Sequence, residues 1–350
     1  MAVTSRRLPS PRTETQEPPA SLVLRRMIDG YQLSQALYVV ATLGVADLLA
    51  GGPRTSAELA EAVGAHPVAL YRVLRALASV GIFHELDGAW FALTSLGDCL
   101  RSDAPEPVGA WAAFVGRSYR WQAWAHLLDS VRTGECAFRQ VHGLSGWDYR
   151  ARNPEENAIF DRAMTDLSRR ASRAIVEAYD FGRHTTVVDV GGGRGALLAA
   201  ILTRYPAVHG IVFDLPQVVA ESPPLLEAAG IAERCEIVGG NFFDGVPPGA
   251  DAYLLKTVLH DWDDEHALRI LHACRRASST GGALVIIEWD LGSRNTARDA
   301  KLSDLEMLVG NGGLERRLDQ YSALLTRSGF RLERSSKTRI GFSVLEATAV

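Results

Sequence analysis

From Thr185 to the C-terminus, short apolar runs alternate with stretches of helical spacing. Five such runs follow one another, each about as long as one β-strand. They are Val187–Val190, Gly210–Asp214, Glu236–Gly239, Ala252–Lys256 and Gly282–Glu288. Buried parallel strands read as continuous apolar segments and are joined by helical crossovers. The alternation therefore predicts an α/β fold with a parallel, Rossmann-like sheet.

A polar residue stands at or just after the end of each run. Parallel strands bring their carboxyl ends to one edge of the sheet, and ligands of open α/β sheets bind there. A carboxylate such as Glu288, at the end of an apolar run, costs on the order of several kcal/mol to bury without a partner. We therefore expect a functional site at this edge. Its expected lining is Asp189, Asp214, Asn241, Lys256, His260 and Glu288.

The end of the first run is rich in glycine. Gly191, Gly193 and Ala196 fit the dinucleotide pattern GxGxxA, in which glycines let a ligand approach the backbone. Asp189 adds a negative charge where a pyrophosphate would lie, so a ligand with ammonium character suits the site better. Asp214 follows Gly191 by 23 positions (214 − 191), the spacing at which a carboxylate holds a ribose diol.

The N-terminal part has a different pattern. Residues 1–20 are rich in Pro, Ser, Thr and charge, which predicts a disordered tail. Residues 21–105 contain a helix that ends at Gly64, a helix opened by Pro67 and a hairpin turned at Asp87–Gly88. This order of elements predicts a mostly helical winged-helix domain.

A winged helix can serve either DNA binding or dimerisation. Between residues 20 and 100 there are five basic and seven acidic residues, a balance of −2 (5 − 7). A DNA-binding module would be clearly basic. The apolar faces of the helices at 22–50 and 66–80 instead exceed what so small a domain can bury. We therefore favour homodimerisation and expect no nucleic-acid partner.

Residues 106–180 are predicted to be helical and are rich in aromatic side chains. Four of the seven tryptophans lie in this segment. Most of these rings are expected to fill a core, and a few to line a pocket for a flat substrate. We assign this segment and the sheet to one unit, residues 106–350.

Bulk properties exclude several classes of protein. The net charge of −4 argues against nucleic acid or an anionic membrane as the main partner. The four cysteines form no CxxC pair, so we expect reduced thiols rather than disulfides or a zinc site. No signal peptide is recognised after Arg7, and the apolar stretch at 36–50 is too short to span a bilayer. We expect a cytoplasmic protein without a membrane partner.

Five motifs and Glu288 together resemble one enzyme family. The motifs are VDVGGGRG (188–195), FDLP (213–216), GGNFF (239–243), LKTVLHDWDDE (255–265) and NGGLER (311–316). They are similar to those of O-methyltransferases of the caffeate and hydroxyindole type, which use S-adenosylmethionine (SAM), and of bacterial relatives that methylate natural products. The likeness covers about residues 22–350. It implies a Rossmann-like methyltransferase domain preceded by a winged-helix dimerisation domain.

The resemblance also implies roles for individual residues. His260 would be the general base, with Glu288 and Glu315 beside it. SAM contacts would come from Ser168, Asp189, Gly191, Gly193, Asp214, Leu215, Asn241, Phe242, Lys256 and Trp262. Acceptor contacts would come from Phe160, Met164, Asp261, Met307 and Asn311. The family usually has Asp at the position of Asn241, so recognition of the adenine differs there in detail.

The expected chemistry is methyl transfer from SAM to a phenolic hydroxyl of an aromatic small molecule, with S-adenosylhomocysteine as the other product. A phenol titrates near about 10 and His near about 6.5, so His260 can accept the proton as transfer proceeds. Glu315, next to Arg316 and Arg317, has a second interpretation, a plain ion pair.

Two alternatives stay open. One is a SAM-binding relative that performs hydroxylation, cyclisation or N-methylation, and the other is a DNA-binding regulator. No metal is expected, because the acidic residues Asp261, Asp263 and Asp264 stand at a helix start, where they act as caps.

Overall fold

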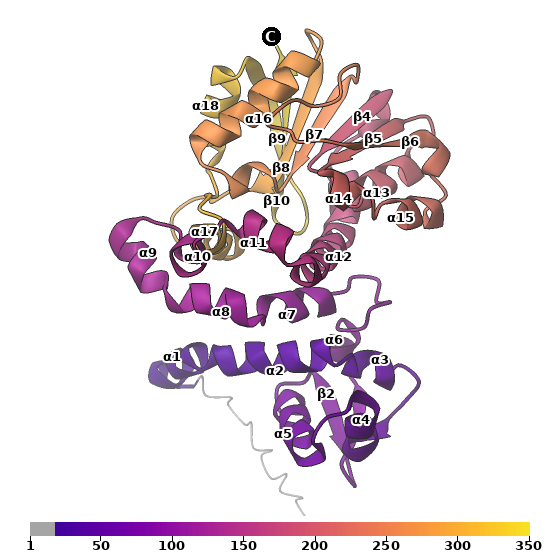
Figure 1. The fold of residues 1–350 in the computed structure, drawn as a ribbon, viewed down its shortest axis with the longest axis vertical. Coiled ribbons are helices and arrows are strands. Elements are labelled where there is room, and N and C mark those ends of the chain that lie inside the picture. The colour runs from indigo at the N-terminus through magenta and orange to yellow at the C-terminus, as the bar shows by residue number, and fades with distance from the viewer. Residues whose placement is uncertain (1–17) are drawn as a thin grey trace, which may run out of the picture.

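The computed structural model describes residues 18–350, so the predicted tail lies almost entirely outside the described residues. Figure 1 shows three layers, with the N-terminal helices at one end, a helical layer in the middle and the large sheet at the other end. Among the described residues, no helix is long and apolar enough to cross a membrane.

The N-terminal domain has the predicted order of helix, turn, helix and hairpin. Its elements are α1 (Ala20–Ile28), α2 (Gly30–Thr42), α3 (Val45–Leu49), β1 (Arg54–Thr55), α4 (Ser56–Val63), α5 (Pro67–Ala78), β2 (Phe83–Leu86), β3 (Trp90–Leu93) and α6 (Ser95–Asp98). Gly44, with φ of 66°, ends α2. A capping box begins α4, since Thr55 Oγ1 accepts from the Glu58 amide at 3.2 Å and Glu58 accepts from the Thr55 amide at 2.8 Å.

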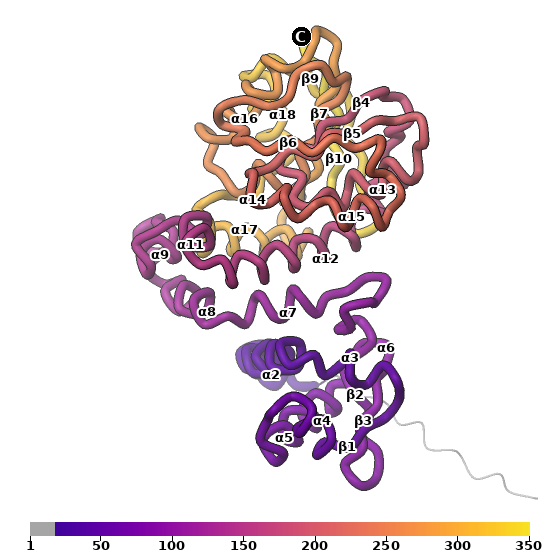
Figure 2. The backbone as a smooth tube through the Cα atoms, turned by 45° about the vertical axis from the view of Figure 1, so that its right-hand side comes forward, coloured from indigo at the N-terminus to yellow at the C-terminus, as the bar shows by residue number. Residues whose placement is uncertain are grey.

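A layer of helices joins this domain to the sheet. They are α7 (Gly109–Val115), α8 (Ser118–Ala125), α9 (Leu127–Thr133), α10 (Ala137–His142), α11 (Gly146–Arg152) and α12 (Pro154–Ala178). Helix α7 packs between α2 and α12, as Figure 2 shows. The aromatic side chains of this layer form a core of their own around Phe114, Tyr119 and Phe138.

The sheet has seven strands in the order β6-β5-β4-β7-β8-β10-β9. The five predicted strands are parallel: β4 (Thr186–Val190), β5 (His209–Asp214), β6 (Cys235–Gly239), β7 (Ala252–Lys256) and β8 (Ala283–Trp289). Strand β10 (Phe342–Ala349) runs antiparallel between β8 and β9 (Phe330–Lys337). The chain leaves β4 in both directions, so the switch point where such sheets bind ligands lies between β4 and β7.

Helices cover both faces of the sheet and bury two apolar cores. One face carries α13 (Ala196–Arg204), α15 (Pro223–Ala228) and the end of α12, and the other carries α16 (Asp264–Ala277) and α18 (Leu318–Arg327). Helix α14 (Pro216–Val219) follows β5, and α17 (Arg298–Gly310) contacts α8 and α10 of the middle layer. Single 3₁₀ turns are η1 (Phe181–Arg183), η2 (Ala232–Arg234) and η3 (Leu259–Asp261).

The contact between α2 and α7 depends on Gly116. A Cβ at this position would lie 2.1 Å from Tyr38 Cγ and 2.2 Å from Tyr38 Cβ, the inflexible base of that side chain. Gly116 has an ordinary φ of −81°, so the need for glycine is steric. We expect Gly116→Ala to lower the free energy of unfolding by about 1–3 kcal/mol, the usual cost of overpacking.

The measurement is denaturant unfolding followed by circular dichroism. Gly30→Ala, in the first turn of α2, is the matched control, because its Cβ would meet no atom within 4 Å. An equally stable Gly116→Ala protein would contradict the tight contact between α2 and α7.

Candidate active site

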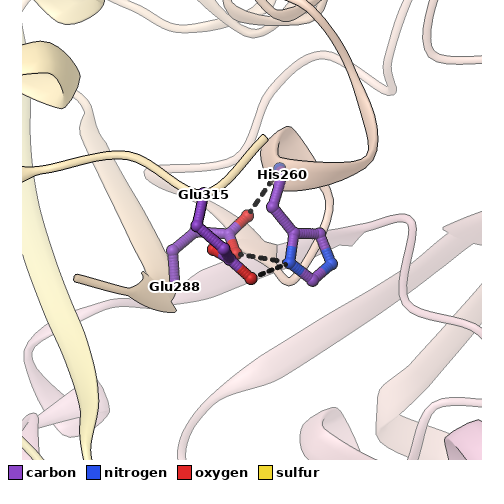
Figure 3. A group of neighbouring side chains, drawn as sticks. All are labelled: His260, Glu288 and Glu315. Atoms are coloured by element: carbon purple, nitrogen blue, oxygen red, sulfur yellow. Dashed lines mark hydrogen bonds and ion pairs between the residues drawn. The ribbon is translucent and has the colours of Figure 1, made fainter. Parts of the chain in front are cut away.

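Three buried titratable side chains meet at the carboxyl edge of the sheet (Figure 3). His260 lies on η3, directly after β7, and Glu288 lies near the end of β8. Glu315 comes from the segment between α17 and α18. His260 is 9% exposed, Glu315 1% and Glu288 0%. The structure thus brings together the three residues expected to be catalytic, from separate parts of the chain.

The imidazole of His260 is oriented by Glu315. Its Nδ1 lies 2.8 Å from Glu315 Oε1 and 3.7 Å from Glu288 Oε2. A carboxylate at hydrogen-bond distance keeps a proton on Nδ1, because an ionised carboxylate only accepts. The neutral ring therefore presents Nε2 as its proton acceptor.

Glu288 mainly holds the backbone that carries His260. Its Oε1 accepts hydrogen bonds from the amides of Val258 at 3.0 Å and Leu259 at 2.9 Å, with the His260 amide at 3.4 Å. These amides are the unpaired donors at the start of η3. Glu288 thus caps the turn with one oxygen and directs its negative charge towards the ring with the other.

Glu315 is itself positioned by α17. Ser303 donates from Oγ to Glu315 Oε1 at 2.6 Å, and Asp304 accepts from the Glu315 amide at 2.9 Å. Neither residue was predicted from the sequence. Ser303 and Asp304 precede Met307, an expected contact of the methyl acceptor on the same helix, by four and three residues (307 − 303 and 307 − 304). This spacing was the available signal, but only the tertiary structure brings α17 to Glu315.

Arg316 holds the turn from the other side. It is fully buried, and it donates to the carbonyls of Leu259 and Trp262, both at 2.9 Å. It also pairs with Asp264 at 2.8 Å. The second interpretation of Glu315, an ion pair with Arg316 or Arg317, is therefore wrong. Arg316 pairs with Asp264, Arg317 with Asp319 and Glu315 with His260.

Gly313 lets this segment reach the turn. A Cβ at Gly313 would lie 2.1 Å from the His260 carbonyl oxygen and 2.4 Å from the Asp261 carbonyl carbon. The next residue, Leu314, donates its amide to that His260 carbonyl at 2.9 Å. Close backbone contact explains the glycine, and its place in the NGGLER motif was the signal for it.

The cluster strongly favours a charged imidazole. Burial acts to lower the pKa of His260, but the carboxylates of Glu288 and Glu315, together with Asp261, outweigh burial and raise that pKa to about 10. Burial also raises the pKa of Glu288 to about 7, although the charge of His260 opposes the rise. In the free protein at neutral pH, His260 is therefore an imidazolium held by carboxylates.

The glycine loop and Asp214 lie side by side at the switch point. Gly191 and Gly193 have φ of 71° and 58°, and a Cβ at Gly193 would meet nothing within 4 Å. Asp214 accepts from the amides of Gly193 at 2.8 Å and Leu215 at 2.7 Å. The open space beside a bare backbone and a carboxylate fits the amino-acid and ribose parts of a nucleoside ligand such as SAM.

Beneath this loop, oppositely charged groups are buried together. Burial raises the pKa of Asp189 to about 7, and the nearby charge of Lys256 opposes the rise. Burial likewise lowers the pKa of Lys256, opposed by Asp189 and Glu288. Lys256 Nζ donates to Ser168 Oγ at 3.1 Å, so α12 and β7 bring these expected SAM contacts together.

The residues expected around the adenine also meet. The rings of Phe242 and Trp262 are 6.1 Å apart and nearly perpendicular, at 85°. Trp262 is nearly parallel to Trp147 of α11, 6.3 Å away, a neighbour that the site prediction lacked. Asn241 Oδ1 accepts from the Phe243 amide at 3.0 Å, so its oxygen already has a partner within the chain.

The residues expected to line the acceptor site fall into two groups. Phe160 and Met164 lie on α12 within the aromatic layer, with Phe160 5.9 Å from Trp147. Asp261 and Asn311 are joined by a hydrogen bond of 2.5 Å, and Asp261 Oδ1 is 3.8 Å from His260 Nε2. Met307 is buried on α17, one turn before Asn311.

The three central residues also meet the distance requirement of a metal site. Ligand atoms of His260, Glu288 and Glu315 lie within 4.8 Å of one another. However, Nδ1 and Glu315 are placed for a hydrogen bond, and Glu288 Oε1 is occupied by amides. Asp263, from the nearby acidic run, accepts from the His266 amide at 2.9 Å and caps α16 as predicted. The expectation of no metal stays a prediction.

Comparison with known proteins gives a consistent result. A family model of the O-methyltransferase domain matches residues 124–331, and one of the O-methyltransferase dimerisation domain matches residues 26–103. A phenazine O-methyltransferase of Lysobacter antibioticus is 42% identical over 332 residues, which cover 95% of this chain and 97% of that protein.

Solved structures agree with the sequence comparison. That of LaPhzM has a TM-score of 0.92 at 42% identity, covering 95% of this chain and 100% of that one. Human N-acetylserotonin methyltransferase in complex with SAM has a TM-score of 0.88 at 29% identity, covering 96% and 99%.

Two similar proteins carry names for other reactions. An 8-amino-8-demethylriboflavin N,N-dimethyltransferase of Streptomyces davaonensis is 36% identical, over 92% of this chain and 93% of that protein. The aclacinomycin 10-hydroxylase of Streptomyces purpurascens is also 36% identical, over 94% and 90%. Both family models and the identity over nearly the whole chain show that this protein belongs to the O-methyltransferase family that combines this catalytic domain with a dimerisation domain.

Proposed function

We propose that this protein transfers a methyl group from SAM to a phenolic hydroxyl of an aromatic small molecule in natural-product biosynthesis. The observation that carries the proposal is the buried His260, whose Nδ1 is held by Glu315 at 2.8 Å. A ring fixed in this way presents Nε2 at the sheet edge where SAM is expected. The aromatic layer of α8, α11 and α12 supplies a wall suited to a flat acceptor.

In the proposed reaction, the acceptor oxygen forms a bond to the methyl carbon while the bond from that carbon to sulfur breaks. The electron pair of the broken bond stays on sulfur, giving S-adenosylhomocysteine. The phenolic proton passes to Nε2 of His260, and Glu288 and Glu315 stabilise the imidazolium that results. Positioning of the two reactants supplies much of the remaining rate.

The carboxylates bring the proton affinity of the base closer to that of the acceptor. They raise the pKa of His260 towards that of an ordinary phenol, about 10, which lowers the cost of proton transfer between the two groups. A charged His260 and a neutral phenol together hold two titratable protons, and the productive complex holds only one of them. The positive sulfonium of SAM would favour loss of that proton, since a like charge disfavours the imidazolium.

The alternative reactions receive less support from the site. A buried histidine base is most useful where a hydroxyl must lose its proton, because a neutral amine nitrogen already has a lone pair for the methyl carbon. DNA binding receives none from the winged helix, whose charge balance is negative. The domain division at residue 105, the cytoplasmic location and the absence of nucleic-acid partners remain predictions.

The first test removes the proposed base. We expect His260→Ala to lower kcat by about 10²–10⁴-fold, the usual contribution of general base catalysis. SAM affinity, measured by titration calorimetry, should stay close to that of the wild type. Release of S-adenosylhomocysteine with a panel of hydroxyaromatic compounds provides the rate. Loss of SAM affinity in parallel with the rate would indicate a structural role for His260.

The second test uses pH. With one acceptor, we expect kcat/KM to rise with pH as the imidazolium of His260 loses its proton. Glu315→Gln removes a negative charge that raises the pKa of His260, so the rising limb should move to lower pH by about one unit or more. The plateau should fall by at least about tenfold, because the imidazolium formed during transfer loses its partner.

Asp299→Asn, an exposed carboxylate on α17, is the matched control and should leave the limb in place. Glu288→Gln should also shift the limb to lower pH while retaining the fold and SAM binding. If the rise of kcat/KM with pH occurs at the same pH in the wild type and in both Glu→Gln variants, a group other than His260 controls it.

The third test concerns assembly. Helix α1 exposes Leu24, Met27 and Ile28 at 59%, 71% and 66%, an apolar face that a homodimer would bury. We expect light scattering at micromolar concentration to give the mass of two chains, and Met27→Glu to reduce it. A wild-type mass of one chain would contradict the proposed homodimer.

A further inference from the structure

The aromatic layer beside the proposed catalytic site contains an unusual arginine. Arg150, on α11, is only 3% exposed. Its guanidinium lies over the rings of Phe160 and Trp147, at 4.0 and 4.5 Å from their centroids. Phe160 is one of the expected acceptor contacts, Trp147 packs against it at 5.9 Å, and neither ring carries a formal charge that could neutralise the arginine.

Arg150 has unused hydrogen-bonding capacity. Within residues 18–350, its Nε and Nη2 are buried without a hydrogen-bond partner, and no carboxylate oxygen lies within 4.0 Å of its nitrogens. Two further donors of the same layer, Trp147 Nε1 and Tyr119 Oη, are likewise buried and unpartnered. Arginine and tryptophan can only donate, whereas a tyrosine hydroxyl can also accept, so three of these four polar atoms require an acceptor.

A second buried arginine of the same layer has the carboxylate partner that Arg150 lacks. Arg120, on α8, is 8% exposed and lies 4.2 Å from the centroid of the Phe114 ring, much like Arg150 on its own rings. Arg120, however, pairs with the carboxylate of Glu306, to which Trp124 also donates at 3.1 Å. One arginine of the layer therefore has its anion within the chain, and the other does not.

An unpaired buried charge is costly. Burial lowers the pKa of Arg150 to about 10, and Tyr119 and Asp261 only partly offset it. The guanidinium still keeps its proton at neutral pH, so the charge remains. Burial of such a charge is strongly unfavourable unless an anion with good geometry compensates it. A ligand carboxylate would provide that compensation, and its two oxygens match the guanidinium fork.

Arg150 is also close to the reacting end of the site. Its Nη1 and the Oδ1 of Asn311 lie 3.4 and 3.3 Å from the point where a Cβ of Gly146 would stand. Asn311 in turn donates to Asp261, the neighbour of His260. One acceptor molecule can therefore span the aromatic layer, with a hydroxyl at His260 and an anionic group at Arg150.

We propose that Arg150 binds a carboxylate of the acceptor, and that the substrates of this protein are hydroxyaromatic acids. The inference rests on the proposed O-methylation, because the acid is the acceptor itself. Trp147 Nε1 and Tyr119 Oη supply further donors to the same carboxylate, while the flat ring packs along Phe160. Arg150 thereby decides which phenols are accepted, and His260 performs the chemistry on them.

The test compares a hydroxynaphthoic acid with the hydroxynaphthamide of the same ring pattern. Binding to protein saturated with S-adenosylhomocysteine is measured by titration calorimetry, so no turnover is needed. We expect the acid to bind the wild type about ten- to hundredfold more tightly than the amide, the effect of hydrogen bonds to a charged group. In Arg150→Gln the ratio of the two dissociation constants should fall towards one.

Arg120→Gln is the matched control and should keep the ratio, because the charge of Arg120 is already paired. Arg150→Lys retains the charge without the fork and should give an intermediate ratio. Binding of S-adenosylhomocysteine by each variant checks its fold. Equal affinity of the wild type for acid and amide, or an unchanged ratio in Arg150→Gln, would overturn the inference.

The same compounds separate this inference from the proposed function. If the acid binds through Arg150 but neither compound is methylated, the proposed function fails and the assignment of Arg150 stands. If both compounds are methylated and bind equally well, the proposed function stands and the assignment of Arg150 fails.

Discussion

The site depends on how the turn at His260 is held in place. Glu288 accepts hydrogen bonds from the amides at the start of η3, and Arg316 donates to the carbonyls of Leu259 and Trp262. The negative Glu288 thus contacts amide N–H groups and the positive Arg316 contacts carbonyl oxygens, so each buried charge meets the backbone groups that stabilise it. The cost of burying either charge is thereby offset, and the backbone beneath the imidazole is fixed.

Around this turn, the sheet, α12 and α17 each contribute to the site. The carboxyl edge of the sheet provides Asp214 and Lys256, and α12 provides Ser168 next to Lys256. Helix α17 positions Glu315 through Ser303 and Asp304. The reacting groups thus rest on strands and helices rather than on long loops, which keeps their geometry close to that required for transfer.

Electrostatics differ between the two ends of the proposed acceptor site. At His260, carboxylates outnumber the cation, so the imidazolium is stabilised and its pKa is raised to about 10. At Arg150, the cation lies on aromatic rings with no carboxylate at contact distance among the described residues. A hydroxyaromatic acid complements both ends, since its hydroxyl can give its proton to the neutral ring of His260 in the productive complex and its carboxylate supplies the anion for Arg150.

The sequence by itself determined the parallel strands, the winged-helix order and the residues at the strand ends. These follow from local patterns, such as the apolar run that ends at Glu288 and the proline that opens the helix at Pro67. Only the tertiary structure decided the pairings. Glu315 stands 55 residues after His260 (315 − 260), and whether it contacts His260 or Arg316 depends on how α17 packs. The unpaired state of Arg150, beside the paired Arg120, is likewise a property of packing, because charge compensation depends on distances in space that local sequence does not encode.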